Sequence, residues 1–351
     1  MSPRRTLACT GLLLLVWAAA ALGQKDDLNV TIDEVKPGNH IFGPATGNAD
    51  FKGKVVLIEV WSTIGQPSLV TIPNLVKWQD ELGSFGLVVV GFHLGETPLA
   101  DVRTKAKALK INFTVTEGGF IKAGTISIPH VSLFDHTGKC IYRGAPAGAE
   151  APMRAAVGAY LTDLGQPAKS KTVVPLLDGL KKGQVTPLAT LQRALPLLKS
   201  ADAATAEDAK LLVAKLSEAG TKRIEQAEAL LTAAVPDPVE AYNQVEKVPN
   251  DFKGTPVADK ATALLATLKK DKVVAEELKA RPSLESIRKI DAALAPLAAK
   301  LDPKDPTFQR TNAFQLANLK NSLAAMQKTY PNAKATEEAV QIAFKYGVAG
   351  K

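Results

Sequence analysis

Cysteine is nearly absent from this chain of 351 residues, which contains only Cys9 and Cys140. Cys9 lies in an N-terminal stretch with the features of an export signal, so removal of that stretch leaves Cys140 alone. A single thiol forms no intramolecular disulfide. The redox chemistry open to the mature chain is therefore restricted to what one thiol can do.

Long basic runs are also missing, although the net charge is +8. Subtracting the two arginines of the N-terminal stretch leaves +6 for the mature chain. The longest runs are the pairs Lys181-Lys182 and Lys269-Lys270, and aromatic residues do not interleave with them. Nucleic-acid binding needs a concentrated basic stripe with stacking residues. We expect dispersed, solvated charge and no nucleic-acid partner.

The common catalytic and cofactor motifs are absent as well. The sequence has no Gly-x-Ser-x-Gly elbow, no phosphate-binding loop ending in Lys-Ser/Thr and no Gly-x-Gly-x-x-Gly after a strand. No His-x-x-x-His spacing joins the four histidines, the obvious candidates for metal ligands. They are His40, His93, His130 and His136. We expect no metal site, no cofactor and no catalytic residue.

The N-terminus has the features of a signal peptide over residues 1–23. Arg4 and Arg5 precede an uncharged apolar run from Gly11 to Leu22, and a small residue, Gly23, sits at the predicted cleavage site. The alternative is a retained anchor, but the run is shorter than the roughly 20 apolar residues that a span needs. Cleavage before Gln24 predicts an exported protein without a stable membrane span. Its location would be a bacterial periplasm or cell envelope, or the outside of the cell.

After an N-terminal segment, 24–40, residues 41–165 alternate strand-like and helix-like patterns. The expected strands are 55–61, 87–94, 130–135 and 139–144, with helices ending near Leu82 and around 99–109. Asp135 to Gly138 read as a hairpin turn between the last two strands. Strands interleaved with helices predict an α/β domain, a central mixed sheet flanked by helices.

The composition changes past Gly165. Residues 166–175 are a plausible linker, and 176–351 are rich in Ala, Leu and Lys without a convincing strand. Apolar residues recur at helical spacing, as at Leu316, Leu319, Leu323 and Met326. Segments 200–216, 252–268 and 330–346 align weakly, so this all-helical domain is either a repeat array or a set of Ala-rich helices that are alike in composition.

The segment FKGKVVLIEVWSTIGQPSLVTIP resembles the TlpA/ResA-like redoxins, exported thioredoxin-fold proteins. In that family the equivalent stretch carries a Trp-Cys-x-x-Cys site followed by a helix with an internal proline. The matching residues here are Lys54, Val55, Val56, Trp61, Thr63, Pro67 and Pro73. Residues 127–144, SIPHVSLFDHTGKCIYRG, resemble the family's Gly-Ile-Pro segment and the hairpin after it. The resemblance covers roughly 45–160 and implies a thioredoxin fold for this part of the chain.

Both sulfurs that this family uses are missing. Its chemistry needs a thiolate at a helix start, where free N–H groups and the helix dipole lower the thiol pKa, and a second thiol one turn later. The two positions are Gly65 and Ser68 here, with Gln66 and Pro67 between them. Cys140 is the only substitute, and its place in a strand favours a small buried residue over a redox thiol.

Other features of the family site are retained. Glu59 occupies the place of the acidic residue that thioredoxins bury below the cysteines, as either a hydrogen-bonded relic or a partly exposed strand residue. Pro129 matches the family's cis-proline, beside which backbone is free to pair with an extended peptide. The resemblance thus implies a candidate binding surface next to positions 65–68. Its residues are Trp61, Ile128, Pro129 and His130.

The residues support three functional hypotheses. The first is an exported, non-redox binding protein that recognises a peptide or protein partner near the former active-site loop and the cis-proline. The alternative is a thiol-disulfide oxidoreductase of the TlpA-like family that acts through an atypical thiol, Cys140 or a partner's cysteine. In the third, the helical domain carries the function and the redoxin domain is a folded spacer.

Overall fold

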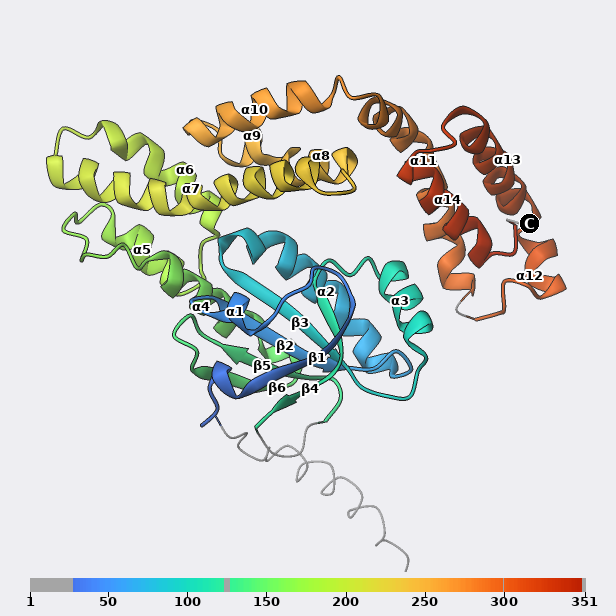
Figure 1. Ribbon diagram of the computed structural model, residues 1–351, viewed down its shortest axis with the longest axis horizontal. Coiled ribbons are helices and arrows are strands. Elements are labelled where there is room, and N and C mark those ends of the chain that lie inside the picture. The colour runs from blue at the N-terminus through green and yellow to red at the C-terminus, as the bar shows by residue number, and fades with distance from the viewer. Residues whose placement is uncertain (1–27, 123–126, 299, 349–351) are drawn as a thin grey trace, which may run out of the picture. The chain divides into compact units, whose positions relative to one another are not determined.

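The structure is a computed structural model that describes residues 28–122, 127–298 and 300–348 (Figure 1). The expected signal peptide and Gln24 lie outside the described residues. By its internal contacts the chain divides into two compact units, Met1–Ala219 and Gly220–Lys351. The boundary falls inside one long helix, α7 (Ala203–Thr232).

The first unit is built on a mixed sheet of six strands in the order β1-β4-β3-β2-β5-β6. These are β1 (Val35–Phe42), β2 (Val55–Trp61), β3 (Leu87–His93), β4 (Thr114–Ile121), β5 (His130–Phe134) and β6 (Cys140–Gly144). β2 pairs in parallel with β3 and antiparallel with β5, and β6 closes a hairpin with β5. This arrangement confirms the predicted thioredoxin-like domain.

β2 lies in the middle of the sheet, and all residues of VVLIEVW except Glu59 are apolar side chains suited to burial on one face or the other. The whole strand is buried, as expected for a strand covered on both faces. On one face Val56, Ile58 and Val60 pack in a cluster with Phe51 of α1 (Asn48–Phe51) and the N-terminal residues Val30 and Ile32. The other face carries Val55, Leu57, Glu59 and Trp61.

Two helices cover the Glu59 face, α2 (Gln66–Leu82) and α4 (Glu150–Leu161), and the Arg154–Glu81 ion pair of 2.8 Å joins them. The buried residues of α2 recur at helical spacing, from Ser68 through Ile72 and Leu75 to Trp78 and Leu82. α3 (Leu99–Ala108) is held at the β1 edge, where Arg103 Nε donates to the Ile41 carbonyl at 3.1 Å.

Two strands of the sheet are absent from the sequence-based expectation. β1 begins at Val35, inside the segment 24–40 that was placed before the domain, and β4 was not predicted. Glycines interrupt the strand pattern of both, and tertiary contacts require them. A Cβ on Gly38 would lie 2.0 Å from the Glu117 carbonyl oxygen, and one on Gly119 would lie 2.3 Å from the Phe92 ring.

The first unit extends beyond the predicted boundary at 165. It also contains α5 (Val174–Lys181), α6 (Pro187–Ala194) and the first part of α7. Gly158 of α4 lets α5 approach closely, because a Cβ there would lie 1.8 Å from the Leu180 carbonyl oxygen. Within the predicted linker, Ser170 is buried and its N–H donates to the Asp208 carboxylate at 2.6 Å. These contacts tie residues 166–181 to the first unit.

The described residues of the second unit form helices joined by turns and short connections, without a strand. Its helices after α7 are α8 (Pro238–Val245), α9 (Val248–Asp251), α10 (Pro256–Leu268), α11 (Lys272–Ala298), α12 (Pro306–Thr311), α13 (Ala313–Thr329) and α14 (Lys334–Lys345). This unit confirms the predicted all-helical region after the sheet domain. The three weakly similar segments fall in α7, α10 and α14, and the repeat remains a prediction.

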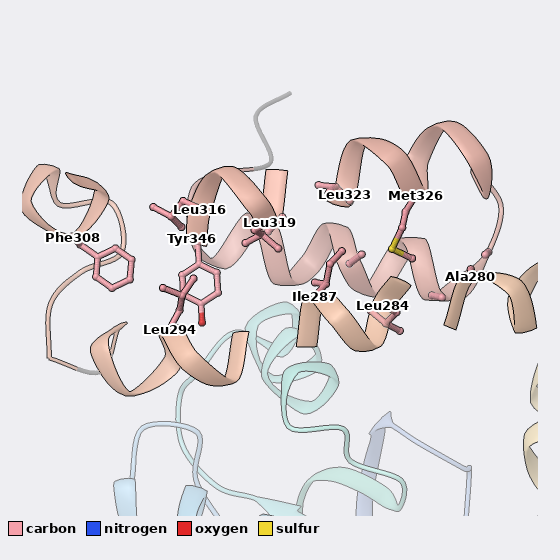
Figure 2. Packing of buried hydrophobic residues seen from close by; sticks show 14 residues of the cluster. Ala280, Leu284, Ile287, Leu294, Phe308, Leu316, Leu319, Leu323, Met326 and Tyr346 are labelled. Carbon is pink, nitrogen blue, oxygen red and sulfur yellow. The ribbon is translucent and has the colours of Figure 1, made fainter. Parts of the chain in front are cut away.

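Figure 2 shows the core of the second unit, where α11, α13 and α14 pack together. The helical spacing predicted for Leu316, Leu319, Leu323 and Met326 is confirmed, since all four are buried on α13. Phe308 stacks on Tyr346 with ring centroids 6.3 Å apart. The Tyr346 hydroxyl donates to Asp291 Oδ1 at 2.6 Å, which fixes the end of α14 against α11.

Candidate functional site

The candidate site lies where β2 ends and α2 begins. The β2–β5 register pairs Val60 with His130, so Ile128 and Pro129 lie beside the loop that follows Trp61. The Ile128–Pro129 peptide bond is cis. The structure therefore brings Gly65 and Ser68, the positions that the resemblance assigns to cysteines, and the Ile128–Pro129 segment to the same end of the sheet.

Gly65 stands at the N-cap of α2, and its carbonyl accepts the N–H groups of Ser68 at 2.9 Å and Leu69 at 3.2 Å. Its φ is −83°, which any residue can adopt. A Cβ built there would lie 3.6 Å from Ser68 Oγ, an ordinary van der Waals distance. The backbone thus has room for a side chain at the attacking position, and none is present.

Ser68, at the position of the second cysteine, is fully buried. Its Oγ accepts the N–H of Ser62 at 3.2 Å, which connects the helix to the start of the loop. This bond is internal to the protein. Ser68 therefore closes the loop rather than offering a donor to a ligand, whereas Gln66 and Pro67 are exposed.

Glu59 lies below this turn and is only 1% exposed. Its Oε1 is 2.5 Å from Thr71 Oγ1 on α2, and its Oε2 has no hydrogen-bond partner among the described residues. Burial raises the pKa of Glu59 from 4.5 to about 7, against the smaller lowering effect of the Thr71 hydrogen bond. Of the two readings of the sequence, the buried hydrogen-bonded acid holds.

Two residues predicted for the binding surface are buried instead. Trp61 is 0% exposed and His130 is 3% exposed, so neither presents its side chain to a partner. The Trp61 ring meets the His93 ring edge-on at a centroid distance of 5.3 Å. Trp61 was expected on the binding surface because of the family resemblance. It is the last residue of a fully buried strand, and its side chain is therefore part of the core.

The accessible surface around the loop is aliphatic. Ile64 in the loop is 83% exposed, Val70 on α2 is 66% exposed and Ile128 is 43% exposed. Leu94 borders the same loop, because its N–H donates to the Trp61 carbonyl at 2.9 Å. Isolated exposed aliphatic residues are common. Here several exposed aliphatic side chains lie around the loop between β2 and α2 and the half-buried Pro129.

Sequence reasoning named neither Thr71 nor Thr97, and it did not place Thr63 beside His93. Thr71 touches Glu59, while Thr63 Oγ1 lies 3.3 Å from His93 Nε2 and 2.9 Å from Thr97 Oγ1. Burial lowers the pKa of His93, which keeps this imidazole neutral at pH 7. The contact of Thr71 with Glu59 depends on how α2 packs on the sheet, and nothing local in the sequence indicated that Thr63 lies beside His93 and Thr97.

No family model and no curated protein matches this chain. Among solved structures, a thiol:disulfide interchange protein of the thioredoxin family from Chlorobium tepidum TLS is 22% identical, with a TM-score of 0.33. The match covers 37% of this chain and 99% of that one. A secreted thiol-disulfide isomerase from Corynebacterium glutamicum is 13% identical over 36% of this chain and 84% of that one, with a TM-score of 0.30.

A third structure, a secreted Mycobacterium tuberculosis disulfide oxidoreductase homologous to E. coli DsbE, is 12% identical. It matches 30% of this chain and 79% of its own, with a TM-score of 0.25. The chain is similar to thiol-disulfide interchange proteins. The likeness covers about a third of the chain, and neither Gly65 nor Ser68 provides the sulfur on which thiol exchange depends.

Cys140 is not placed to act as a substitute nucleophile. It is 1% exposed in the core cluster on the sheet face opposite Glu59, and its Sγ lies 3.7 Å from the Tyr142 carbonyl oxygen.

Within residues 28–122, 127–298 and 300–348, no group of three or more His, Cys, Asp or Glu side chains gathers to hold a metal ion. In the same ranges no helix combines the length and the apolar character that a membrane crossing requires.

Proposed function

We propose that this is an exported thioredoxin-fold protein that binds a peptide or protein partner without redox chemistry. The binding surface is the loop at Ile64 and Gly65 together with the Ile128–Pro129 segment. One observation carries the proposal: the attacking position is Gly65, with space for a side chain and no functional group, while the surrounding surface remains exposed and aliphatic.

The recognition mode that fits this surface is an extended segment lying across the loop. Backbone groups beside Pro129 would pair with the segment, and aliphatic side chains of the partner would contact Ile64, Val70 and Ile128. Main-chain pairing tolerates varied sequences, and the aliphatic contacts provide the selectivity. The partner expected from this chemistry is an extended, apolar-rich peptide or protein loop.

A thiol-disulfide oxidoreductase is the second candidate, and similarity to interchange proteins favours it. It would have to act through Cys140 or through a cysteine of the partner. The burial of Cys140 argues against the first route, because reactive thiols are partly exposed and close to positive charge. Alkylation of the native protein distinguishes the candidates: an inert Cys140 supports binding, and a fast-reacting one supports the enzyme.

Export is part of the proposal. The N-terminal signal features support it, as do two similar proteins that are described as secreted. N-terminal sequencing of the protein recovered from its native cell envelope tests it. A mature chain beginning at Gln24 is the expected result, and an intact Met1 in a membrane fraction would contradict cleavage.

The binding test uses an array of short cysteine-free peptides of varied sequence, followed by fluorescence anisotropy with the best binder. The variant Ile64→Asp places a charge on the surface and should weaken binding about tenfold or more. Val235→Asp is a matched control, because both residues are 83% exposed and Val235 lies in the second unit. Binding of no peptide, or equal loss in both variants, would refute the proposed surface.

A further inference from the structure

Thr71 has one hydroxyl hydrogen and two oxygen neighbours close enough to accept it. Its Oγ1 lies 2.5 Å from Glu59 Oε1 and 2.8 Å from the carbonyl oxygen of Ser68. Both distances are those of good O–H···O hydrogen bonds. A hydroxyl donates only one hydrogen, so the second bond needs a hydrogen from elsewhere.

Protonated Glu59 supplies that hydrogen. The Glu59 carboxylic acid then donates to Thr71 Oγ1, and Thr71 donates onward to the Ser68 carbonyl. An ionised Glu59 would take the Thr71 hydrogen and leave two oxygens 2.8 Å apart with no hydrogen between them. It would also leave a charged Oε2 buried without a partner.

Among the residues that the structure describes, no charged neighbour offsets a negative charge on Glu59. On β3, Gly91 pairs with Glu59, and His93 lies two residues further along the strand. On β5, Val131 pairs with Glu59, whereas the neighbouring His130 points to the opposite face of the sheet. On α2 the first charged residue is Lys77. α4 buries apolar residues toward the sheet, and its Arg154 is paired with Glu81 and Glu150. His93 is already neutral at pH 7, because burial lowers its pKa.

The Thr71 bond acts on a helix start with few other attachments. Pro73 lies inside α2 and has no N–H, so the Leu69 carbonyl lacks its helical donor. No side chain caps the helix at Gly65. Ser68 in turn holds the loop through the N–H of Ser62. The chain of bonds therefore runs from Glu59 through Thr71 and Ser68 to the loop.

We propose that Glu59 is a proton-dependent anchor for the loop and the first turn of α2. When Glu59 is protonated, Thr71 holds the Ser68 carbonyl and the loop is ordered. When Glu59 loses its proton, Thr71 turns to the carboxylate, and the Ser68 carbonyl keeps only the backbone donor that the helix provides. The regulatory consequence rests on the proposed function: a peptide binds more tightly to the ordered loop, because less order has to be imposed on binding.

Amide NMR of the full mature chain, titrated from about pH 5.5 to 8.5, tests the anchor directly. The reporters are the amides of Ser62, Ser68 and Leu69 and the carboxyl carbon of Glu59. In the wild type all should shift together with a midpoint near 7. In Glu59→Gln the three amides should stay still, and in the exposed control Glu96→Gln they should shift as in the wild type.

Thr71→Val separates the anchor from a general effect of charge. It keeps the shape of the side chain and removes the hydroxyl, so Glu59 should still titrate while the Ser68 amide no longer follows. The proposal is overturned if the amides shift equally in wild type and Glu59→Gln, or if the Glu59 carbon titrates near its ordinary value of 4.5.

Anisotropy with the array-selected peptide tests the regulatory half. The wild type should bind several-fold more tightly at the acid end of the titration than at the alkaline end, and Glu59→Gln should bind equally at both. Equal wild-type affinity at both ends would overturn regulation. Failure of all peptides at every pH would instead refute the proposed function, and the NMR titration would still decide whether the anchor exists.

Discussion

At the scale of single residues, the candidate site has no thiol at its loop and has a buried carboxyl group below it. The resemblance assigns Gly65 and Ser68 to the two cysteine positions; Gly65 is the N-cap of α2, and Ser68 Oγ accepts the N–H of Ser62. Glu59 is still buried below them and still bonded to α2. At the two positions that the resemblance assigns to cysteines, the side chains carry no thiol, and the backbone between them begins a regular helix.

Glu59 should make the first unit less stable as pH rises. Its native pKa of about 7 exceeds the ordinary 4.5, so between these values the native state holds a proton that the unfolded state has lost. Stability should fall across that window and level off above it. Glu59→Gln removes the effect and should add roughly 3 kcal/mol at alkaline pH and little near pH 4.5.

Urea unfolding followed by tryptophan fluorescence measures this change in the right unit, since the described tryptophans, Trp61 and Trp78, both lie in the first one. The control is Glu96→Gln, which should track the wild type at every pH. Parallel pH profiles for wild type and Glu59→Gln would mean that Glu59 titrates normally.

Restoring both sulfurs should restore the chemistry. In the double variant Gly65→Cys with Ser68→Cys, the first Cβ would lie 3.6 Å from the position of the second side-chain atom, within reach of a disulfide. The helix start should lower the pKa of the first thiol. Reduction of insulin disulfides should rise well above the wild-type level, and the single variant Gly65→Cys should stay much slower. An inactive, folded double variant would show that more than the sulfurs was lost.

At the scale of elements, the sequence predicted those whose pattern is local. β2, β3, β5 and β6 were expected within a residue of their observed ends, as were α2 and α3, because continuous apolar runs and helical spacing identify them. β1 and β4 were missed because Pro37, Gly38, Gly118 and Gly119 interrupt the strand pattern. Their place in the sheet depends on cross-strand contacts, which no local pattern records.

The site residues also fall into those that the sequence predicted and those that depend on tertiary packing. The positions of Gly65, Ser68, Glu59 and Pro129 followed from the resemblance of two segments. The contact of Thr71 with Glu59 and the burial of Trp61 depend on how α2 packs on the sheet, so spacing alone could not establish them.

The packing of α5 on α4 should be sensitive to one glycine. Gly158→Ala places a Cβ 1.8 Å from the Leu180 carbonyl oxygen, a backbone atom that cannot move alone. We expect a loss of about 2 kcal/mol or more in the unfolding free energy of the first unit. Gly47→Ala is the matched control, because nothing lies within 4 Å of its Cβ and its φ of −116° suits alanine. Equal stability of the two variants would contradict the described packing.

At the scale of the whole molecule, two units carry separate hydrophobic cores. One lies on the sheet of the first unit, and the other is formed by α11, α13 and α14 of the second. The expected boundary at 165 differs from this division because α5 and α6 belong with the sheet domain. The reason is packing: Ser170 and Val173 are buried, although the composition around them is that of a linker.

A cavity in the core of the second unit should lower the stability of that unit and leave the stability of the first unit nearly unchanged. Leu319→Ala removes a fully buried side chain from α13 and should destabilise the second unit by about 3 kcal/mol. Circular dichroism, which follows all helices, should show an earlier transition. Tryptophan fluorescence, which reports the first unit, should keep its midpoint. A common shift of both signals would mean that the two cores unfold together.

We propose that the protein recognises its partner without thiol chemistry. The measurement to make first is the turnover of insulin disulfides by the mature wild-type chain. The variant Cys140→Ser is assayed in parallel. We expect no turnover above background from either protein, because Gly65 lacks a nucleophile and Cys140 is buried. Wild-type turnover that disappears in Cys140→Ser would contradict the account and identify Cys140 as the active thiol.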